Sequence, residues 1–140
     1  MRRRLLIAGA CAFVLAGPAR AAEGGGKGDV GQYVDLQPVG LPIVDRGRLV
    51  NYVFVSVRIN LTSAANASRL REKEPFFRDA LVRAAHRTPF TLASDFGKID
   101  AQRLASTLKA EAARIAGQGQ IRSVVVTQQA PLRRYIAPRG

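Results

Sequence analysis

The longest run of alternating hydrophobic and polar positions covers residues 49–61 and predicts a β-strand. One face of this strand would carry Leu49, Val53, Val55, Val57, Ile59 and Leu61, and the other face Val50, Tyr52, Phe54, Ser56, Arg58 and Asn60. The first half is hydrophobic on both faces, whereas the second half is hydrophobic on one face only. This pattern is typical of a long central strand that emerges from under a helix.

Two further strands are predicted, one before the central strand and one after the helical region. Residues 33–44 are hydrophobic but contain two prolines and a glycine, which favours an edge strand or a bulged lead-in because proline cannot donate a backbone hydrogen bond. The Asp-Arg-Gly-Arg sequence of residues 45–48 predicts a turn into the central strand. The last strand is expected over residues 121–128, around three consecutive valines.

The segment after Thr62 and Ser63, which are the expected helix caps, has the period of an amphipathic helix up to about residue 87. Its hydrophobic stripe consists of Leu70, Phe77, Leu81 and Ala84. Pro75 interrupts the pattern, and a proline inside a helix removes a backbone hydrogen bond and clashes with the preceding turn. We therefore expect a kink or a break into two helices near Glu74.

Asp100 is expected to cap a second helix, which Gly117 and Gly119 would end. Its hydrophobic stripe consists of Leu104, Leu108, Ala112 and Ile115. The predicted order is therefore strand, strand, helix, helix, strand. The most economical packing of these elements is a two-layer α+β domain, with both helices on one face of an antiparallel or mixed sheet.

Residues 1–21 have the order of a secretory signal peptide, with three arginines, an uncharged stretch and then Ala19-Arg20-Ala21. The hydrophobic part, residues 5–17, is 13 residues long, whereas a helix needs about 20 residues to cross a bilayer. We expect export to the periplasm and cleavage after Ala21. The alternative is that residues 5–19 remain as an anchor in the inner membrane, and the export route stays open.

The remaining chain divides into three parts by composition. Residues 22–32 contain five glycines and predict a flexible tether. The α+β domain is expected over residues 33–130, and a basic tail over residues 131–140. In that tail, Arg133, Arg134 and Arg139 are candidate contacts to acidic groups of a protein partner or to phospholipid.

Length and charge narrow the classes of partner. The chain has 140 residues, which suits one domain, and its 22 Lys and Arg against 10 Asp and Glu give a net charge of +12. Without residues 1–21 it would keep 18 basic and 10 acidic residues, a net charge of +8, and no cysteine. A basic exported domain suits an anionic membrane surface or an acidic partner, and the export signal argues against nucleic acid.

The chain offers few side chains for catalysis or metal binding. It contains one Cys and one His, whereas a structural zinc site needs four such ligands. His86 follows Asp79 and Arg83 at helical spacing, which predicts an exposed charge ladder and not a catalytic site. An exported hydrolase would depend on this one histidine or on carboxylates that ion pairing and capping explain better. We therefore predict no enzymatic activity, no catalytic residue, no metal and no cofactor.

Several short segments point to a known family by their order and spacing. They are Tyr33-x-x-Leu36-x-Pro38, the alternating strand of residues 52–61, Glu74-Pro75-Phe76-Phe77-Arg78-Asp79-Ala80-Leu81, Thr91-Leu92, Gly97-Lys98 and the closing strand of residues 121–127. Together they resemble the periplasmic domain of the flagellar basal body-associated FliL family. The resemblance covers about 95 of the 140 residues, and no motif in it is catalytic.

This resemblance implies a stomatin-like α+β domain without enzymatic activity, an N-terminal membrane helix, and assembly around the stator units of the flagellar motor. The chain departs from the family in its short, cleavable hydrophobic N-terminus, in Val39-Gly40-Leu41-Pro42, and in Gln128-Gln129-Ala130-Pro131. An exported relative that works outside the flagellum is therefore also considered.

We expect a non-enzymatic exported scaffold or binding protein that supports a flagellar or other inner-membrane complex from the periplasmic side. The alternative is a basic soluble periplasmic protein, unrelated to flagella, that binds an anionic envelope surface or an acidic partner. The oligomeric state stays open, with a homo-oligomer among the alternatives.

Overall fold

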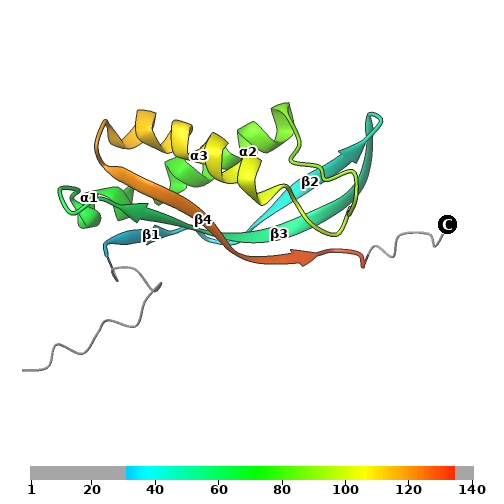
Figure 1. The fold of residues 1–140 in the computed structure, drawn as a ribbon, viewed down its shortest axis with the longest axis horizontal. Helices are drawn as coiled ribbons and strands as arrows, with labels where there is room; N and C mark the ends of the chain where they lie inside the picture. The colour runs from blue at the N-terminus through cyan, green and yellow to red at the C-terminus, as the bar shows by residue number, and fades with distance from the viewer. Residues whose placement is uncertain (1–30, 135–140) are drawn as a thin grey trace, which may run out of the picture.

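The computed structural model describes residues 31–134 (Figure 1). Its elements are β1 (Tyr33–Asp35), β2 (Val39–Asp45), β3 (Arg48–Leu61), α1 (Ala67–Glu72), α2 (Glu74–Arg87), α3 (Ala101–Ala116) and β4 (Ile121–Pro131). The predicted signal peptide of residues 1–21, the alternative anchor, most of the tether and Arg139 lie outside the described residues. Within the described residues, no helix combines the length and hydrophobicity that crossing a membrane requires.

All four strands form one antiparallel sheet around β3, which confirms the predicted central strand. β1 pairs with residues 58–60 of β3, and β2 pairs with residues 48–55. β4 pairs with residues 53–61 and overlaps both of these stretches, so it lies along the opposite edge of β3. The helices form a second layer on one face of the sheet (Figure 1), and the predicted α+β architecture is confirmed.

Pro75 divides the first helical segment into two, as expected. α1 ends at Glu72, and Lys73 joins it to α2, which begins at Glu74. Pro75 then occupies the first turn of α2. Backbone N–H groups in the first turn have no acceptor within the helix, so the proline costs the helix no hydrogen bond there.

The N-cap of α1 is Asn66, so the expected capping by Thr62 and Ser63 is wrong. The Asn66 side-chain oxygen accepts a hydrogen bond from the Arg69 N–H at 3.1 Å. Residues 62–65 first form a turn, in which the Ala65 N–H donates to the Thr62 carbonyl at 3.1 Å. Because of this turn, the helix begins only at Ala67.

The hydrophobic core lies between the sheet and the helices and matches most of the predicted stripes. Its buried side chains include Val53, Val55, Val57, Ile59 and Leu61 of β3, Leu70 of α1, Phe77, Leu81 and Ala84 of α2, and Leu104, Leu108 and Ala112 of α3. Ile115 is only partly buried. Asp100 caps α3 through a hydrogen bond from the Arg103 N–H at 3.1 Å, and Gly117 ends it with a φ of 96°, as expected.

The β2–β3 hairpin closes through Arg46 and Gly47, within the predicted turn. Both residues have positive φ, 51° and 76°, as a two-residue type I′ turn requires. The glycine adopts a positive φ without steric cost. The backbone twist of a type I′ turn also matches the twist of the two flanking strands.

A register shift next to this turn changes which residues at the start of β3 face the core, so the prediction for Leu49 is wrong. Ile43 pairs with Asn51, but Val44 pairs with Leu49, so Val50 is an extra residue on β3. Such a bulge interrupts the alternation of faces. Leu49, expected in the core, is 54% exposed, whereas Asn51 is only 6% exposed.

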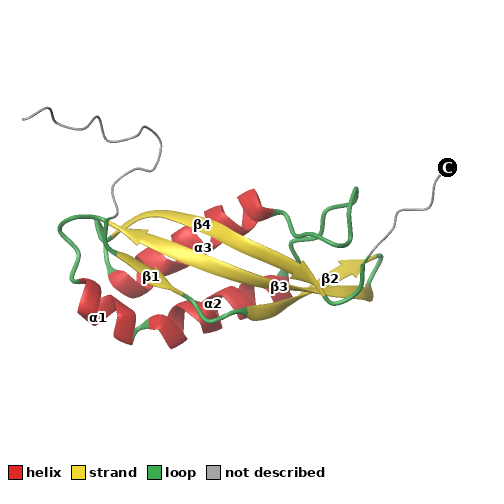
Figure 2. Ribbon diagram, turned by 90° about the horizontal axis from the view of Figure 1, so that it is seen from below, coloured by secondary structure: helices red, strands yellow, loops and turns green. Residues whose placement is uncertain are grey.

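Only one face of the sheet is covered. Figure 2 looks onto the other face, with the strands in front of the helices, and no described helix lies over it. β4 reaches Pro131, three residues beyond its predicted end, and widens this face next to the hairpin.

Candidate binding surface at the hairpin end

The strand pairing divides the uncovered face into a hydrophobic half next to the β2–β3 hairpin and a polar half next to β1. The hydrophobic half contains the cross-strand pairs Pro42–Tyr52, Gly40–Phe54 and Phe54–Ala130, and the polar half contains Asp35–Arg58, Tyr33–Asn60 and Asn60–Ser123. The prediction that the first half of β3 is hydrophobic on both faces is therefore correct, but helices cover only one of them.

Five residues form what we call the hairpin-end surface: Leu49, Val50, Tyr52, Phe54 and Leu132. Four of them are largely exposed: the exposed fraction is 54% for Leu49, 38% for Val50, 45% for Phe54 and 59% for Leu132. Leu132 lies beside Tyr52, because its N–H donates to the Tyr52 carbonyl at 2.8 Å. All members except Phe54 line one shallow hollow, which Arg133 also borders.

Gly40 explains how Phe54 is held on this surface. A Cβ atom at residue 40 would stand 3.1 Å from Cε1 of the Phe54 ring, closer than ordinary van der Waals contact. The glycine thus leaves the space that the ring occupies over the neighbouring strand. The ring is packed on one side and remains 45% exposed on the other.

Asn51 fixes the C-terminal segment beside the hairpin-end surface. Its Nδ2 donates to the carbonyls of Phe96 at 3.0 Å and of Arg133 at 2.9 Å. Its Oδ1 accepts from the N–H groups of Tyr52 at 2.9 Å and of Arg133 at 3.1 Å. All four hydrogen-bonding positions of this buried amide are used, so the backbone around residues 132–133 is held in place.

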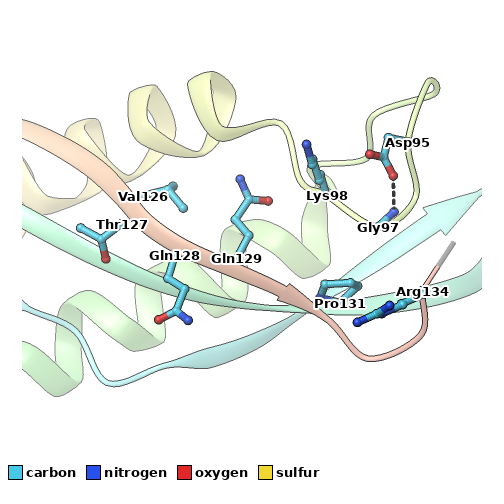
Figure 3. A pocket seen from close by; sticks show the side chains of 9 residues that line it. All are labelled: Asp95, Gly97, Lys98, Val126, Thr127, Gln128, Gln129, Pro131 and Arg134. Carbon is cyan, nitrogen blue, oxygen red and sulfur yellow. Dashed lines mark hydrogen bonds between the residues drawn. The ribbon is translucent and has the colours of Figure 1, made fainter.

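The predicted contact arginines do not form one cluster. Arg133 borders the hairpin-end surface, whereas Arg134 lines a separate open pocket with Lys98 and Gln129. Figure 3 shows this pocket, with Arg134 beside Pro131 at its rim. Arg139 lies outside the described residues.

Sequence reasoning did not select the arginines of the turn for the site. Arg46 and Arg48 are exposed and adjoin Leu49 along the chain. Within residues 31–134, no ion pair involves either of them or Arg133. The hairpin end therefore combines exposed hydrophobic side chains with more basic than acidic residues, since Asp45 is the one carboxylate beside Arg46, Arg48 and Arg133.

The polar half pairs its charged groups internally. Arg58 contacts Asp35 through two hydrogen bonds, Nε–Oδ1 at 2.7 Å and Nη2–Oδ2 at 3.0 Å, and its guanidinium carbon lies 3.9 Å from the centroid of the Tyr33 ring. The hydrogen bond to Asp35 raises the pKa of Arg58. Next to them, Asn60 Nδ2 donates to Ser123 Oγ at 3.0 Å.

His86 lies on the helical side, in an open groove between α2 and α3. It is exposed, and its Nδ1 lies 2.8 Å from the Val82 carbonyl oxygen. Asp79 and Arg83 form an ion pair of 2.8 Å nearby, so the predicted exposed charge ladder is confirmed. The part of the chain that the structure describes contains no group of three or more His, Cys, Asp or Glu residues that could hold a metal ion.

Comparison with models of known protein families and with curated proteins finds no match for this chain. The resemblance to the FliL family therefore stays a prediction.

Proposed function

We propose that this protein is a non-enzymatic exported scaffold or binding protein that supports an inner-membrane complex from the periplasmic side. The observation that carries the proposal is the hairpin-end surface, where four hydrophobic side chains are 38–59% exposed at one end of a sheet that has a face without a covering helix among the described residues. Contiguous exposed hydrophobic patches mark interaction sites in soluble domains.

The way this surface is held also supports a scaffold. Asn51 bonds the C-terminal segment to β3, and the two-residue turn at Arg46 and Gly47 keeps the hairpin short. Rigid elements hold binding groups more accurately than loops do. The surface is therefore preformed, and little conformational entropy would be lost in ordering it when a partner binds.

The predicted location and partner come from the sequence. The signal-like residues 1–21 favour the periplasm, and the resemblance to the FliL family favours a complex at the flagellar motor. A second candidate, a basic protein that binds an anionic envelope surface, is favoured by the exposed and unpaired arginines Arg46, Arg48 and Arg133.

Site-specific photocrosslinking in cells tests the scaffold proposal. A photoreactive residue in place of Phe54 should capture an inner-membrane protein. The same residue in place of Phe76, which is 63% exposed on α2, is the matched control and should capture it far less. If position 54 captures only soluble periplasmic proteins, the scaffold proposal is wrong.

Two simpler experiments bear on the same proposal. Intact-mass analysis of the exported protein should find Ala22 as its first residue, and retention of Met1 in a membrane fraction would contradict this. Deletion of the gene should change motility or the stability of an envelope complex. Complementation with a His86→Ala variant should restore the phenotype fully, because the proposal involves no turnover.

A further inference from the structure

We propose that the hairpin-end surface docks directly on an anionic lipid bilayer, with the uncovered face of the sheet toward the membrane. This inference deepens the second candidate function, the binding of an anionic envelope surface, and rests on it for the location of the protein at the membrane. It names lipid, rather than a protein, as the partner that this surface fits.

The shape of the sheet favours lipid. The sheet bends around the helical layer, so its uncovered face is convex (Figure 1). Phe54 on this face and Leu132, which lies beside Tyr52 just beyond β4, are 45% and 59% exposed. A protein partner would need a concave hydrophobic surface that matches this one, whereas the headgroup region of a bilayer adapts to any shape and accepts such side chains to a depth of about 5–10 Å.

The charge at the hairpin end complements an anionic membrane. Arg46, Arg48 and Arg133 are exposed, and Asp45 is the one acidic residue in the hairpin over residues 44–50. Arginine can place its aliphatic stem against hydrophobic groups while its guanidinium reaches phosphate oxygens. Each arginine near an anionic surface should strengthen binding about fivefold.

Other exposed hydrophobic residues lack this combination. Phe76 shares its groove with three arginines, but each of them is paired with Asp79 or Glu111. Val125 is 45% exposed and lies opposite Arg58, whose charge is already paired with a carboxylate of β1. Among the described residues, the hairpin end thus brings four exposed hydrophobic side chains together with three arginines that form no ion pair.

The chain contains no tryptophan, so a single introduced tryptophan reports on its own position. We compare full-chain Leu132→Trp and Phe76→Trp variants on vesicles of phosphatidylglycerol mixed with phosphatidylethanolamine. Both variants carry the same N-terminal segment, so any binding by that segment affects them equally. The emission of Leu132→Trp should shift to shorter wavelength and be quenched by brominated lipid, whereas that of Phe76→Trp should not. Equal shifts, or no shift in either variant, would overturn the inference.

A charge-matched pair of variants, each in the Leu132→Trp background, tests the role of the arginines. Arg48→Gln combined with Arg133→Gln should lower the vesicle partition coefficient about 25-fold. Arg69→Gln combined with Lys109→Gln removes the same charge from exposed helical positions. This control should change the partition coefficient by about twofold or less, because charges farther than about 10 Å are screened. Equal losses would mean that net charge, and not this surface, drives binding.

The two proposals fail separately. If photocrosslinking at position 54 captures a membrane protein but vesicles leave the Leu132→Trp emission unchanged, the surface binds protein and the lipid inference is wrong. If vesicles shift that emission but crosslinking in cells captures no membrane complex, lipid docking stands and the scaffold function is wrong. The circular dichroism spectrum of each variant should match that of the wild type, which shows that the variant is folded.

Discussion

The two halves of the uncovered sheet face meet solvent in different ways. Near β1, Asp35 and Arg58 pair with each other, and Asn60 bonds to Ser123, so the polar groups find partners within the sheet. Near the hairpin, Phe54 and Leu132 remain about half exposed, and nothing in the described residues covers them. The polar half therefore needs no partner to satisfy its polar groups, whereas the hydrophobic half resembles a binding interface that is exposed to solvent.

Both halves depend on the same core, and removing volume from it should have the largest effect. Leu81 is 1% exposed on α2, and Leu81→Ala should lower the free energy of unfolding by about 2–5 kcal/mol through the cavity that it leaves. Urea melts measure this loss. The control on the same helix, His86→Ala, removes an exposed side chain and should change stability by about 0.5 kcal/mol or less. Comparable losses would contradict the packing described for α2.

The second prediction compares two asparagines of β3, one on each side of the sheet. Asn51→Ala should lower the free energy of unfolding by about 2–3 kcal/mol, because it leaves buried groups around Phe96 and Arg133 without partners. Hydrogen exchange at the Leu132 and Arg133 amides should also accelerate. Asn60→Ala, in the polar half, loses one partly exposed hydrogen bond and should cost about 1 kcal/mol or less. A larger loss for Asn60→Ala would reverse the comparison.

Local patterns were sufficient to predict most of the fold. The alternation in β3 gave its buried face from Val53 to Leu61, and the 3.6-residue period gave the buried stripes of α2 and α3. Pro75 marked the helix break because a proline constrains its own backbone. These features are encoded within a few residues of where they act, so a single sequence reveals them.

The candidate site depends on contacts that leave no local signal. The Asn51 side chain bonds to Arg133, 82 residues later in the chain, and the bulge at Val50 follows from pairing with β2. The one available sign was that Asn51 is the single polar residue among the odd-numbered positions of residues 49–61. Arg133 was selected for its charge, but the sequence could not show that it borders exposed leucines.

The third prediction concerns the ion pair of the polar half. Because the hydrogen bond to Asp35 raises the pKa of Arg58, this contribution is present at neutral pH and is lost only in strongly alkaline solution, so salt is the better variable. Asp35→Asn should lower the melting temperature slightly at low salt and less at high salt, because exposed charges are screened. Asp95→Asn keeps the acceptor for the Gly97 N–H and breaks no ion pair of the described residues. Its effect should not change with salt, and a salt-dependent effect there would contradict this reading.

The smallest effect on stability is expected at the hairpin-end surface. Leu132 is 59% exposed, and its contact with β3 runs through the backbone. Leu132→Ser should therefore change the free energy of unfolding by about 0.5 kcal/mol or less, while it weakens vesicle partition about tenfold, because the side chain no longer enters the lipid. Val124→Ser, on β4 and only 8% exposed, should instead cost about 2 kcal/mol or more.

The two measurements on Leu132→Ser together separate a contact surface from a part of the core. A side chain that stabilises the fold lowers stability when it is shortened, and any loss of binding then follows from unfolding. A side chain kept for a partner leaves stability unchanged and affects binding alone. If Leu132→Ser destabilised the domain as much as Asn51→Ala, Leu132 would belong to the structural network around Asn51, and the contrast between the two halves of the sheet would disappear.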